Sequence, residues 1–189
     1  MSVEIEMKVK SVFESQSKTG TYVLLLENID ENDKQQIPII IGEKEAHAIY
    51  CALYDIPNAR PLSHDIMTSA IQFLNGNISK VLVYKVDQGI YYSYIYLNRG
   101  EQFTRIDART SDAVALALRL DVPLYIDKQI LDQENIEVVM EGDNSPSVPI
   151  SKTTKILSLE ELKAKLEKAI DQEDYEQASV LRDQIASFK

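Results

Sequence analysis

Residues 102–120 decide which kind of fold this chain forms, and they read Gln102-Phe-Thr-Arg-Ile-Asp-Ala-Arg-Thr-Ser-Asp-Ala-Val-Ala-Leu-Ala-Leu-Arg-Leu120. The first part favours a strand over Gln102–Asp107. The second part predicts a helix over Thr110–Leu120 that is apolar on nearly every side, and such a helix has to be buried. The core of the protein therefore contains a helix, and the same segment contributes at least one strand.

Most of the chain around this segment reads as strands. We expect them over Val3–Glu14, Thr21–Asn28, Ile37–Ile41, Lys80–Val86, Ile90–Asn98 and Pro123–Ile126. Asp87-Gln-Gly89 has the composition of a short hairpin turn between two of them. Strands and helices mix without strict alternation, so the predicted fold class is α+β, a mixed sheet with packed helices.

Two further helices are predicted between the strands. The first covers Glu43–Tyr54. The second begins at an N-cap, Ser63, and runs from His64 to about Asn75. Its 3.6-residue period places four residues toward the core, namely Met67, Ala70, Ile71 and Leu74.

The composition changes near residue 141, where a polar stretch with two prolines and a glycine begins. We divide the chain into a domain over 1–140, a linker over 141–156 and a C-terminal antiparallel helical hairpin over 157–189. The predicted hairpin helices are Ser158–Asp171 and Asp174–Phe188, each with one apolar stripe. A hairpin this short cannot bury enough area by itself, so its seam needs a protein partner or a second copy.

Composition limits the classes of protein to consider. The apolar runs are far shorter than the roughly 20 residues that span a bilayer, no signal-peptide pattern opens the sequence, and the single cysteine excludes an internal disulfide. We therefore expect a cytoplasmic protein without membrane contact. The net charge of −10 does not favour nucleic-acid binding. A nuclease of this charge would need a local basic cleft or bridging metal ions.

Three stretches resemble, in order and spacing, the signature motifs of the bifunctional nuclease (DNase–RNase) family. They are Ile39-Ile-Ile-Gly-Glu-Lys-Glu-Ala-His-Ala48, Arg60-Pro-Leu-Ser-His-Asp65 and Ile106-Asp-Ala-Arg-Thr-Ser-Asp-Ala-Val-Ala-Leu-Ala-Leu-Arg119. The resemblance covers about Val3 to Glu137. It implies an α+β fold, a tendency to form homo-oligomers and the nuclease activity described for some members. Thr110 departs from the pattern, which has proline at that position.

Residues 162–185 are similar to the UVR motif of UvrB and UvrC. Tyr175-Glu176, Ala178 and Leu181-Arg-Asp183 carry the similarity, and Ser179 replaces the more usual alanine. In that family the hairpin is a protein–protein interaction module. This agrees with the exposed seam that the apolar stripes predict.

Hydrolysis of a phosphodiester needs an activated water, neutralisation of charge on the phosphate and a proton for the leaving oxygen. The signature stretches contain suitable residue types. We predict a catalytic set of His64, Asp65, Asp107 and Asp112, with Arg60 and Arg109 binding substrate phosphate. His64 would carry the proton. Asp65 and Asp107 would hold a divalent metal, Mg²⁺ or Mn²⁺, or position the water.

Each of these residues also has a structural interpretation, which the sequence leaves open. Asp65 and Asp112 fall in the first turns of predicted helices, where the helix dipole favours a carboxylate. Asp107 and Arg109 can pair with each other at a strand end, and Arg60 with an acid elsewhere. Glu45 lies off the apolar stripe of its helix and is interpreted as solvated surface.

The strand over Ile90–Asn98 has a second pattern. Tyr92, Tyr94 and Tyr96 fall on one face, opposite Ile95 and Leu97. Such a stripe can stack nucleic-acid bases, form a subunit contact or support a second packing layer. Two functions follow from the whole sequence: a metal-assisted nuclease of broad specificity acting on DNA, RNA or both, or a non-catalytic oligomeric interaction or regulatory module.

Overall fold

The computed structural model describes residues 3–15, 20–30 and 32–136. The chain divides into two units, Met1–Thr153 and Thr154–Lys189, and the described residues all belong to the first. The hairpin predicted over 157–189 and the linker predicted over 141–156 lie outside the described residues. No helix in the described part of the chain is long and apolar enough to cross a membrane.

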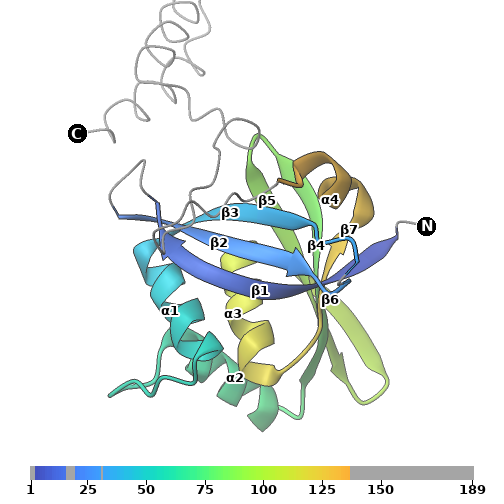
Figure 1. The fold of residues 1–189 in the computed structure, drawn as a ribbon. Helices are drawn as coiled ribbons and strands as arrows, with labels where there is room; N and C mark the ends of the chain where they lie inside the picture. The colour runs from blue at the N-terminus through green and yellow to red at the C-terminus, as the bar shows by residue number, and fades with distance from the viewer. Residues whose placement is uncertain (1–2, 16–19, 31, 137–189) are drawn as a thin grey trace, which may run out of the picture. The chain divides into compact units, whose positions relative to one another are not determined.

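Seven strands of the described residues form one sheet in the order β3-β2-β1-β7-β4-β5-β6 (Figure 1). Their bounds are β1 Glu4–Glu14, β2 Thr21–Asn28, β3 Gln36–Gly42, β4 Asn77–Asp87, β5 Ile90–Arg99, β6 Gln102–Arg109 and β7 Leu124–Asp127. Two antiparallel meanders, β1-β2-β3 and β4-β5-β6, are joined by β7, which pairs antiparallel with β1 and parallel with β4. This mixed sheet confirms the predicted α+β class.

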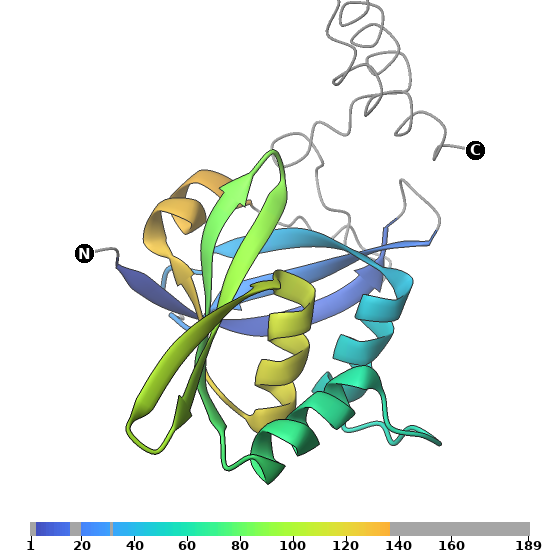
Figure 2. The same ribbon diagram turned by 180° about the vertical axis from the view of Figure 1, so that it is seen from behind.

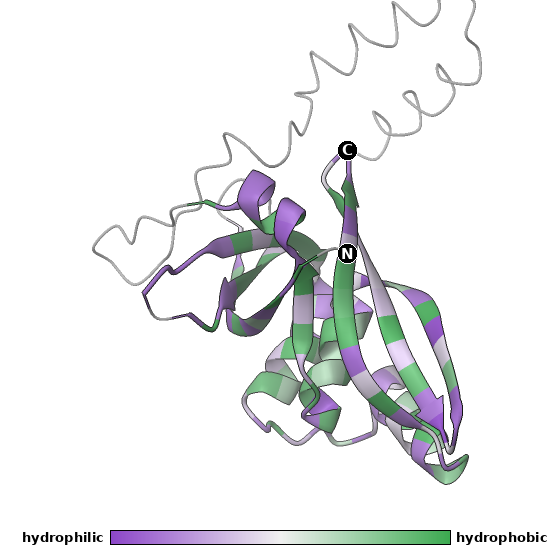
Figure 3. Cartoon of the chain, turned by 90° about the vertical axis from the view of Figure 1, so that its right-hand side faces the viewer, coloured by the Kyte–Doolittle hydropathy of each residue, from purple (hydrophilic) through white to green (hydrophobic). Residues whose placement is uncertain are grey.

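Four helices complete the described fold, namely α1 Glu43–Leu53, α2 Ser63–Phe73, α3 Thr110–Leu120 and α4 Lys128–Glu134. Helices α1 and α3 pack side by side against the inner face of the sheet (Figure 2). Apolar and polar stretches can be followed along the strands in Figure 3. Buried residues alternate with half-buried ones along most of β5, which directs one set of its side chains into this core, whereas Val23–Asn28 of β2 are all buried. Leu24, Leu26, Ile49 and Ile126 lie at the centre of this core and are completely buried.

Helix α3 confirms the prediction from residues 110–120. Seven of its residues are buried, from Thr110 to Ala117 with Asp112 as the exception. The alanines allow α3 to lie close to α1 and to the sheet together, because small side chains keep backbones near each other. Asp121 ends the helix in the left-handed conformation, with φ of 51°.

The orientation predicted for α2 was wrong. All eleven residues of α2 are described and none of them is buried. Ile71 alone of the predicted four packs against the core, whereas Met67, Ala70 and Leu74 are exposed and Phe73 is 85% exposed. The 3.6-residue spacing of the apolar residues was predicted correctly. However, α2 packs mainly on α3, through the N-terminal end of α2. No described element therefore covers the apolar face of α2.

The start of α2 also differs from the prediction. Leu62, not Ser63, is the N-cap residue, and its backbone N–H donates to Oδ2 of Asp65 at 2.7 Å. The carboxylate of Asp65 thereby takes over the stabilisation that the serine hydroxyl was expected to provide. The alternation of β5 was predicted correctly: Tyr91, Ser93 and Ile95 are buried, and Tyr92, Tyr94 and Tyr96 lie half-buried on the other face.

Candidate functional site: a histidine–carboxylate–arginine cluster

The first turns of three helices supply the acidic groups of the site. Glu45, Asp65 and Asp112 are each the third residue of their helix, α1, α2 and α3 in that order. A carboxylate at this position interacts favourably with the free N–H groups and the positive end of the helix dipole. The favourable interaction with the helix start thus explains why each acid occupies this position. Contacts between the helices then determine which partner each carboxylate binds.

Arg109 connects two of these helices. It is the last residue of β6 and the N-cap residue of α3. Its Nε and Nη2 donate to Oδ2 and Oδ1 of Asp112 at 2.8 and 3.1 Å, and its Nη1 donates to Oε1 of Glu45 at 3.0 Å. These bonds engage three of the five guanidinium N–H groups. The side chain is still 68% exposed, so the other two can meet an anion from solution.

Gly42 permits the position of Glu45. A Cβ at residue 42 would lie 2.6 Å from Oε2 of Glu45. The side chain of Glu45 therefore folds back over the start of α1, where only a glycine leaves room for it. Glu45 was interpreted from the sequence as solvated surface, but it is half-buried and paired with Arg109.

His64 joins the cluster from α2. Its Nε2 lies 3.1 Å from Oδ1 of Asp112, and its side chain is only 12% exposed. Burial would raise the pKa of Asp112, but hydrogen bonds from Arg109 and His64 outweigh burial and lower it. Asp112 is therefore a carboxylate that accepts the proton of Nε2, and this leaves Nδ1 of His64 as the basic nitrogen of the neutral ring.

Asp65 follows His64 directly but turns to a different partner. Its Oδ1 accepts a hydrogen bond of 2.6 Å from Nε of Arg119, whose Nη1 also donates to the carbonyl oxygens of Ala48 and Ala115. The hydrogen bond from Arg119 is the main reason why the pKa of Asp65 is lowered. Arg119 is 10% exposed. This pair therefore ties α2 to α3 and, through Ala48, to α1.

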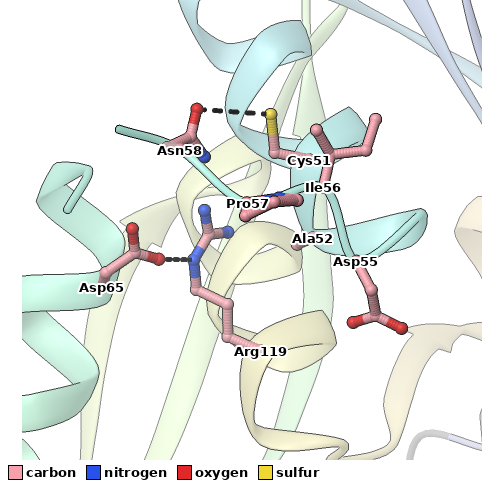
Figure 4. Close-up of a pocket in the computed structure, with 8 residues that line it drawn as sticks. All are labelled: Cys51, Ala52, Asp55, Ile56, Pro57, Asn58, Asp65 and Arg119. Atoms are coloured by element: carbon pink, nitrogen blue, oxygen red, sulfur yellow. Dashed lines mark hydrogen bonds and ion pairs between the residues drawn. The ribbon is translucent and has the colours of Figure 1, made fainter. Parts of the chain in front are cut away.

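A pocket of about 280 Å³ opens beside this ion pair. It is lined by Cys51, Ala52, Asp55, Ile56, Pro57, Asn58, Asp65 and Arg119. Figure 4 shows the Asp65–Arg119 pair and the contact of 3.7 Å from Sγ of Cys51 to Oδ1 of Asn58 as separate parts of its wall. Arg119 lies seven residues after Asp112 on α3, which corresponds to about 10 Å along the helix axis. The wall of the pocket at Arg119 therefore lies about two turns of α3 away from Asp112.

The structure brings His64, Arg109 and Asp112 together, with Glu45 as a fourth member. It does not bring in the other predicted residues. Asp107 accepts a hydrogen bond of 2.9 Å from the hydroxyl of Tyr84 on the sheet. Arg60 is exposed in the loop before α2 and forms no ion pair with the described residues.

Sequence reasoning missed Arg119. A charged residue near the end of an otherwise apolar helix needs a partner when the helix is buried. This rule could have indicated that Arg119 binds a carboxylate.

The predicted metal ligands do not fit a metal site as they lie here. Asp65 and Asp107 have different partners, Arg119 and Tyr84. Among the described residues no group of three or more His, Cys, Asp or Glu side chains is placed to hold a metal ion. We therefore assign no catalytic step to a metal, and the need for Mg²⁺ or Mn²⁺ stays a prediction.

The fold and this cluster define an α+β domain with an acid–base pair and an exposed arginine, a set of groups suited to an anionic substrate. Residues 23–139 match the family model of the bifunctional nuclease domain, and residues 157–189 match the UvrB/uvrC motif. The chain belongs to the bifunctional nuclease domain family and carries a C-terminal UVR motif.

Similar proteins occur in bacteria and plants. An uncharacterised protein of Mycobacterium tuberculosis is 29% identical over 145 residues, which cover 77% of this chain and 85% of that protein. Bifunctional nuclease 1 of Arabidopsis thaliana is 23% identical over 175 residues, covering 81% of this chain and 52% of the plant protein. Bifunctional nuclease 1 of japonica rice is 26% identical over 106 residues, covering 54% and 32%.

Proposed function

We propose that this protein hydrolyses phosphodiester bonds in DNA, RNA or both, with broad specificity, at the cluster of Glu45, His64, Arg109 and Asp112. The observation that carries the proposal is convergence. These residues come from three stretches of sequence that each resemble a signature stretch of the bifunctional nuclease family, and hydrogen bonds of 2.8–3.1 Å join them. The relationship to plant proteins named bifunctional nucleases supports the same class of reaction.

Arg109 is the group that would bind the phosphate. Two guanidinium N–H groups remain after its bonds to Asp112 and Glu45, and they face solvent on an exposed side chain. They can donate to the non-bridging oxygens and neutralise the charge that grows on them during the reaction. Glu45 is a positioning residue here, because it holds the guanidinium without touching the substrate.

His64 is the group that would move the proton. As water bonds to phosphorus, the bond to the leaving oxygen breaks and that oxygen needs a proton. Protonated His64 can supply it from Nδ1, because Nε2 is held by Asp112, and it can recover a proton from the attacking water. Asp112 fixes the orientation of the ring through its bond to Nε2, as a carboxylate behind a catalytic histidine does.

The test compares the two histidines of the chain. His64→Gln should reduce turnover of a single-stranded DNA or RNA substrate by about 10²- to 10⁴-fold. His47→Gln is the matched control, because His47 is exposed on α1 and contacts Cys51 rather than the cluster. Equal loss of activity in both variants, or full activity in His64→Gln, would exclude His64 as the proton carrier.

A second candidate function has two observations in its favour. The apolar face of α2 is exposed in the described structure, and the C-terminal segment matches a motif of the UvrB/uvrC type. A non-catalytic module that binds a protein partner or a second copy would use such surfaces. Stable association without any turnover of nucleic acid would favour this function over hydrolysis.

A further inference from the structure

An aromatic surface covers the outer side of the sheet, turned away from α3. We call it the tyrosine face, and it consists of Tyr84, Tyr92, Tyr94, Tyr96, Phe103 and Tyr125. The tyrosines are half-buried and Phe103 is 78% exposed. The strands β4, β5 and β6 carry most of it, and β7 contributes Tyr125.

The rings on this face are held in fixed positions. Tyr84 and Tyr94 are stacked, with centroids 3.8 Å apart and planes within 9° of parallel, and Tyr96 meets Tyr94 edge-on at 6.4 Å. The hydroxyl of Tyr84 donates to Asp107, and contacts with Tyr94 and Asp107 raise the pKa of Tyr84. The face is thus a preformed aromatic layer, since its rings are ordered before any ligand arrives.

Three cations lie over these rings. Lys80 is 4.8 Å from the centroid of Tyr96, Lys85 is 4.9 Å from Tyr92, and Arg105 is 4.3 Å from Tyr94. Each of the three tyrosines that β5 contributes to this face therefore has a positive group above it. Glu4 pairs with Lys80 and Asp87 with Lys85, so the face is close to neutral in a chain whose net charge is −10.

The tyrosine face leads to the candidate site. In the pairing of β5 with β6, Tyr96 lies opposite Arg105, Tyr94 opposite Asp107 and Tyr92 opposite Arg109. Directly opposed residues of an antiparallel pair project from the same side of the sheet. The aromatic row therefore ends beside the backbone of Arg109, whose guanidinium turns to Asp112 and Glu45 on the helices.

We propose that the tyrosine face binds single-stranded nucleic acid and directs it to Arg109, which makes single strands the substrate class of the hydrolase proposed above. Bases in a duplex have their faces covered by neighbouring bases, so only unpaired strands can stack on these rings.

Binding requires an exchange of partners on the rings. A base that stacks on a tyrosine displaces the lysine or arginine above it, and the released cation pairs with the phosphate of that nucleotide. Stacking of one base changes affinity by roughly 5- to 150-fold, whereas an exposed cation–π contact is equivalent to roughly 2- to 5-fold. The exchange is therefore favourable even before the cation meets its phosphate.

The experiment uses the full chain and fluorescent probes of about a dozen nucleotides, a length within the usual site size of such surfaces. The probes are oligo(dT), oligo(U) and a duplex of equal length, followed by fluorescence anisotropy with probe integrity checked on a gel. We expect both single strands to bind more tightly than the duplex. The ratio of the two single-strand affinities shows whether DNA or RNA is preferred.

Two variants and a control locate the binding surface. Tyr94→Leu should weaken single-strand binding by roughly 5- to 150-fold. Phe103→Ala should also weaken it, and because Phe103 is exposed this variant folds even if Tyr94→Leu does not. Tyr50→Leu is the matched control, since Tyr50 of α1 forms an aromatic pair at 4.6 Å with Tyr54, the residue that follows the helix, away from this face.

The outcomes separate this proposal from the proposed hydrolysis. Unchanged affinity in both Tyr94→Leu and Phe103→Ala overturns the tyrosine face and leaves hydrolysis unaffected. If these variants change only the sedimentation of the chain, the face is a contact between copies and the proposal is also overturned. Binding that depends on the tyrosines without cleavage by any form of the chain supports the proposal and removes the hydrolysis.

Discussion

Replacing Asp65 by asparagine should destabilise the domain. Its carboxylate accepts bonds from Nε of Arg119 at 2.6 Å and from the N–H of Leu62 at 2.7 Å. Loss of a helix-start acceptor costs about 0.5–2 kcal/mol, and loss of a bond between charged groups about 1.5–3 kcal/mol. Asp65 is 37% exposed, so water replaces part of the lost hydrogen bonding. We therefore expect the free energy of unfolding to fall by about 2–3 kcal/mol in total. The melting temperature should then fall by roughly 4–12 °C.

The pH dependence follows from the lowered pKa of Asp65. A carboxylate whose pKa is lower in the folded state adds stability above its unfolded pKa of about 3.9, and this stability is lost as the pH falls through the folded value. The asparagine at this position does not titrate. The difference in stability between the two proteins should therefore be constant above about pH 5 and shrink below about pH 4.

Urea unfolding of the two proteins at several pH values measures this difference. Asp132→Asn is the control, because Asp132 forms an exposed ion pair of 3.1 Å with Lys128, and such pairs contribute about 0–1 kcal/mol. The sequence placed Asp65 in the catalytic set, and that role predicts that Asp65→Asn reduces turnover with little change in melting temperature. Equal stability of wild type and variant at pH 7, with turnover lost, would restore that prediction and refute the structural role.

Three further outcomes are expected. Gly42→Ala should push Glu45 away from Arg109 and reduce nuclease activity several-fold, while urea unfolding shows a change below about 1 kcal/mol, because the displaced group is the end of a flexible side chain. Truncation at about Ser151 should preserve cooperative thermal unfolding and change only assembly or partner binding, and loss of that cooperativity would contradict a separable hairpin. Nuclease activity should fall steeply with salt, which titration with NaCl checks.

Much of the fold could be predicted because its signals are local. Thr110–Leu120 is apolar on nearly all sides, and in a small domain such a helix has to lie in the core. The alternation along Ile90–Asn98 likewise fixes which residues of β5 enter the core. The face of α2 could not be predicted in this way. The helical period shows which residues share one face of a helix. It does not show which other element of the fold covers that face.

The site could be predicted only as a set of residue types. Asp65 and Arg119 are 54 positions apart, and no local pattern indicates that they pair. Asp107 and Arg109 are two positions apart, yet one bonds to Tyr84 and the other reaches Glu45 and Asp112. Both residues lie on β6, but Arg109 is its last residue, so its side chain reaches the helices while that of Asp107 stays with the sheet.

The place of β7 in the sheet has a consequence for how the domain folds. This strand of four residues, Leu124–Asp127, pairs with Glu4–Met7 of β1 and with Val81–Val83 of β4, and the described sheet has no other link between its two meanders. Each meander can form early from contacts between neighbours in sequence, whereas β7 has to close a loop of more than a hundred residues to reach β1. During synthesis the edges of β1 and β4 therefore stay unpaired until β7, one of the last segments of the domain, emerges.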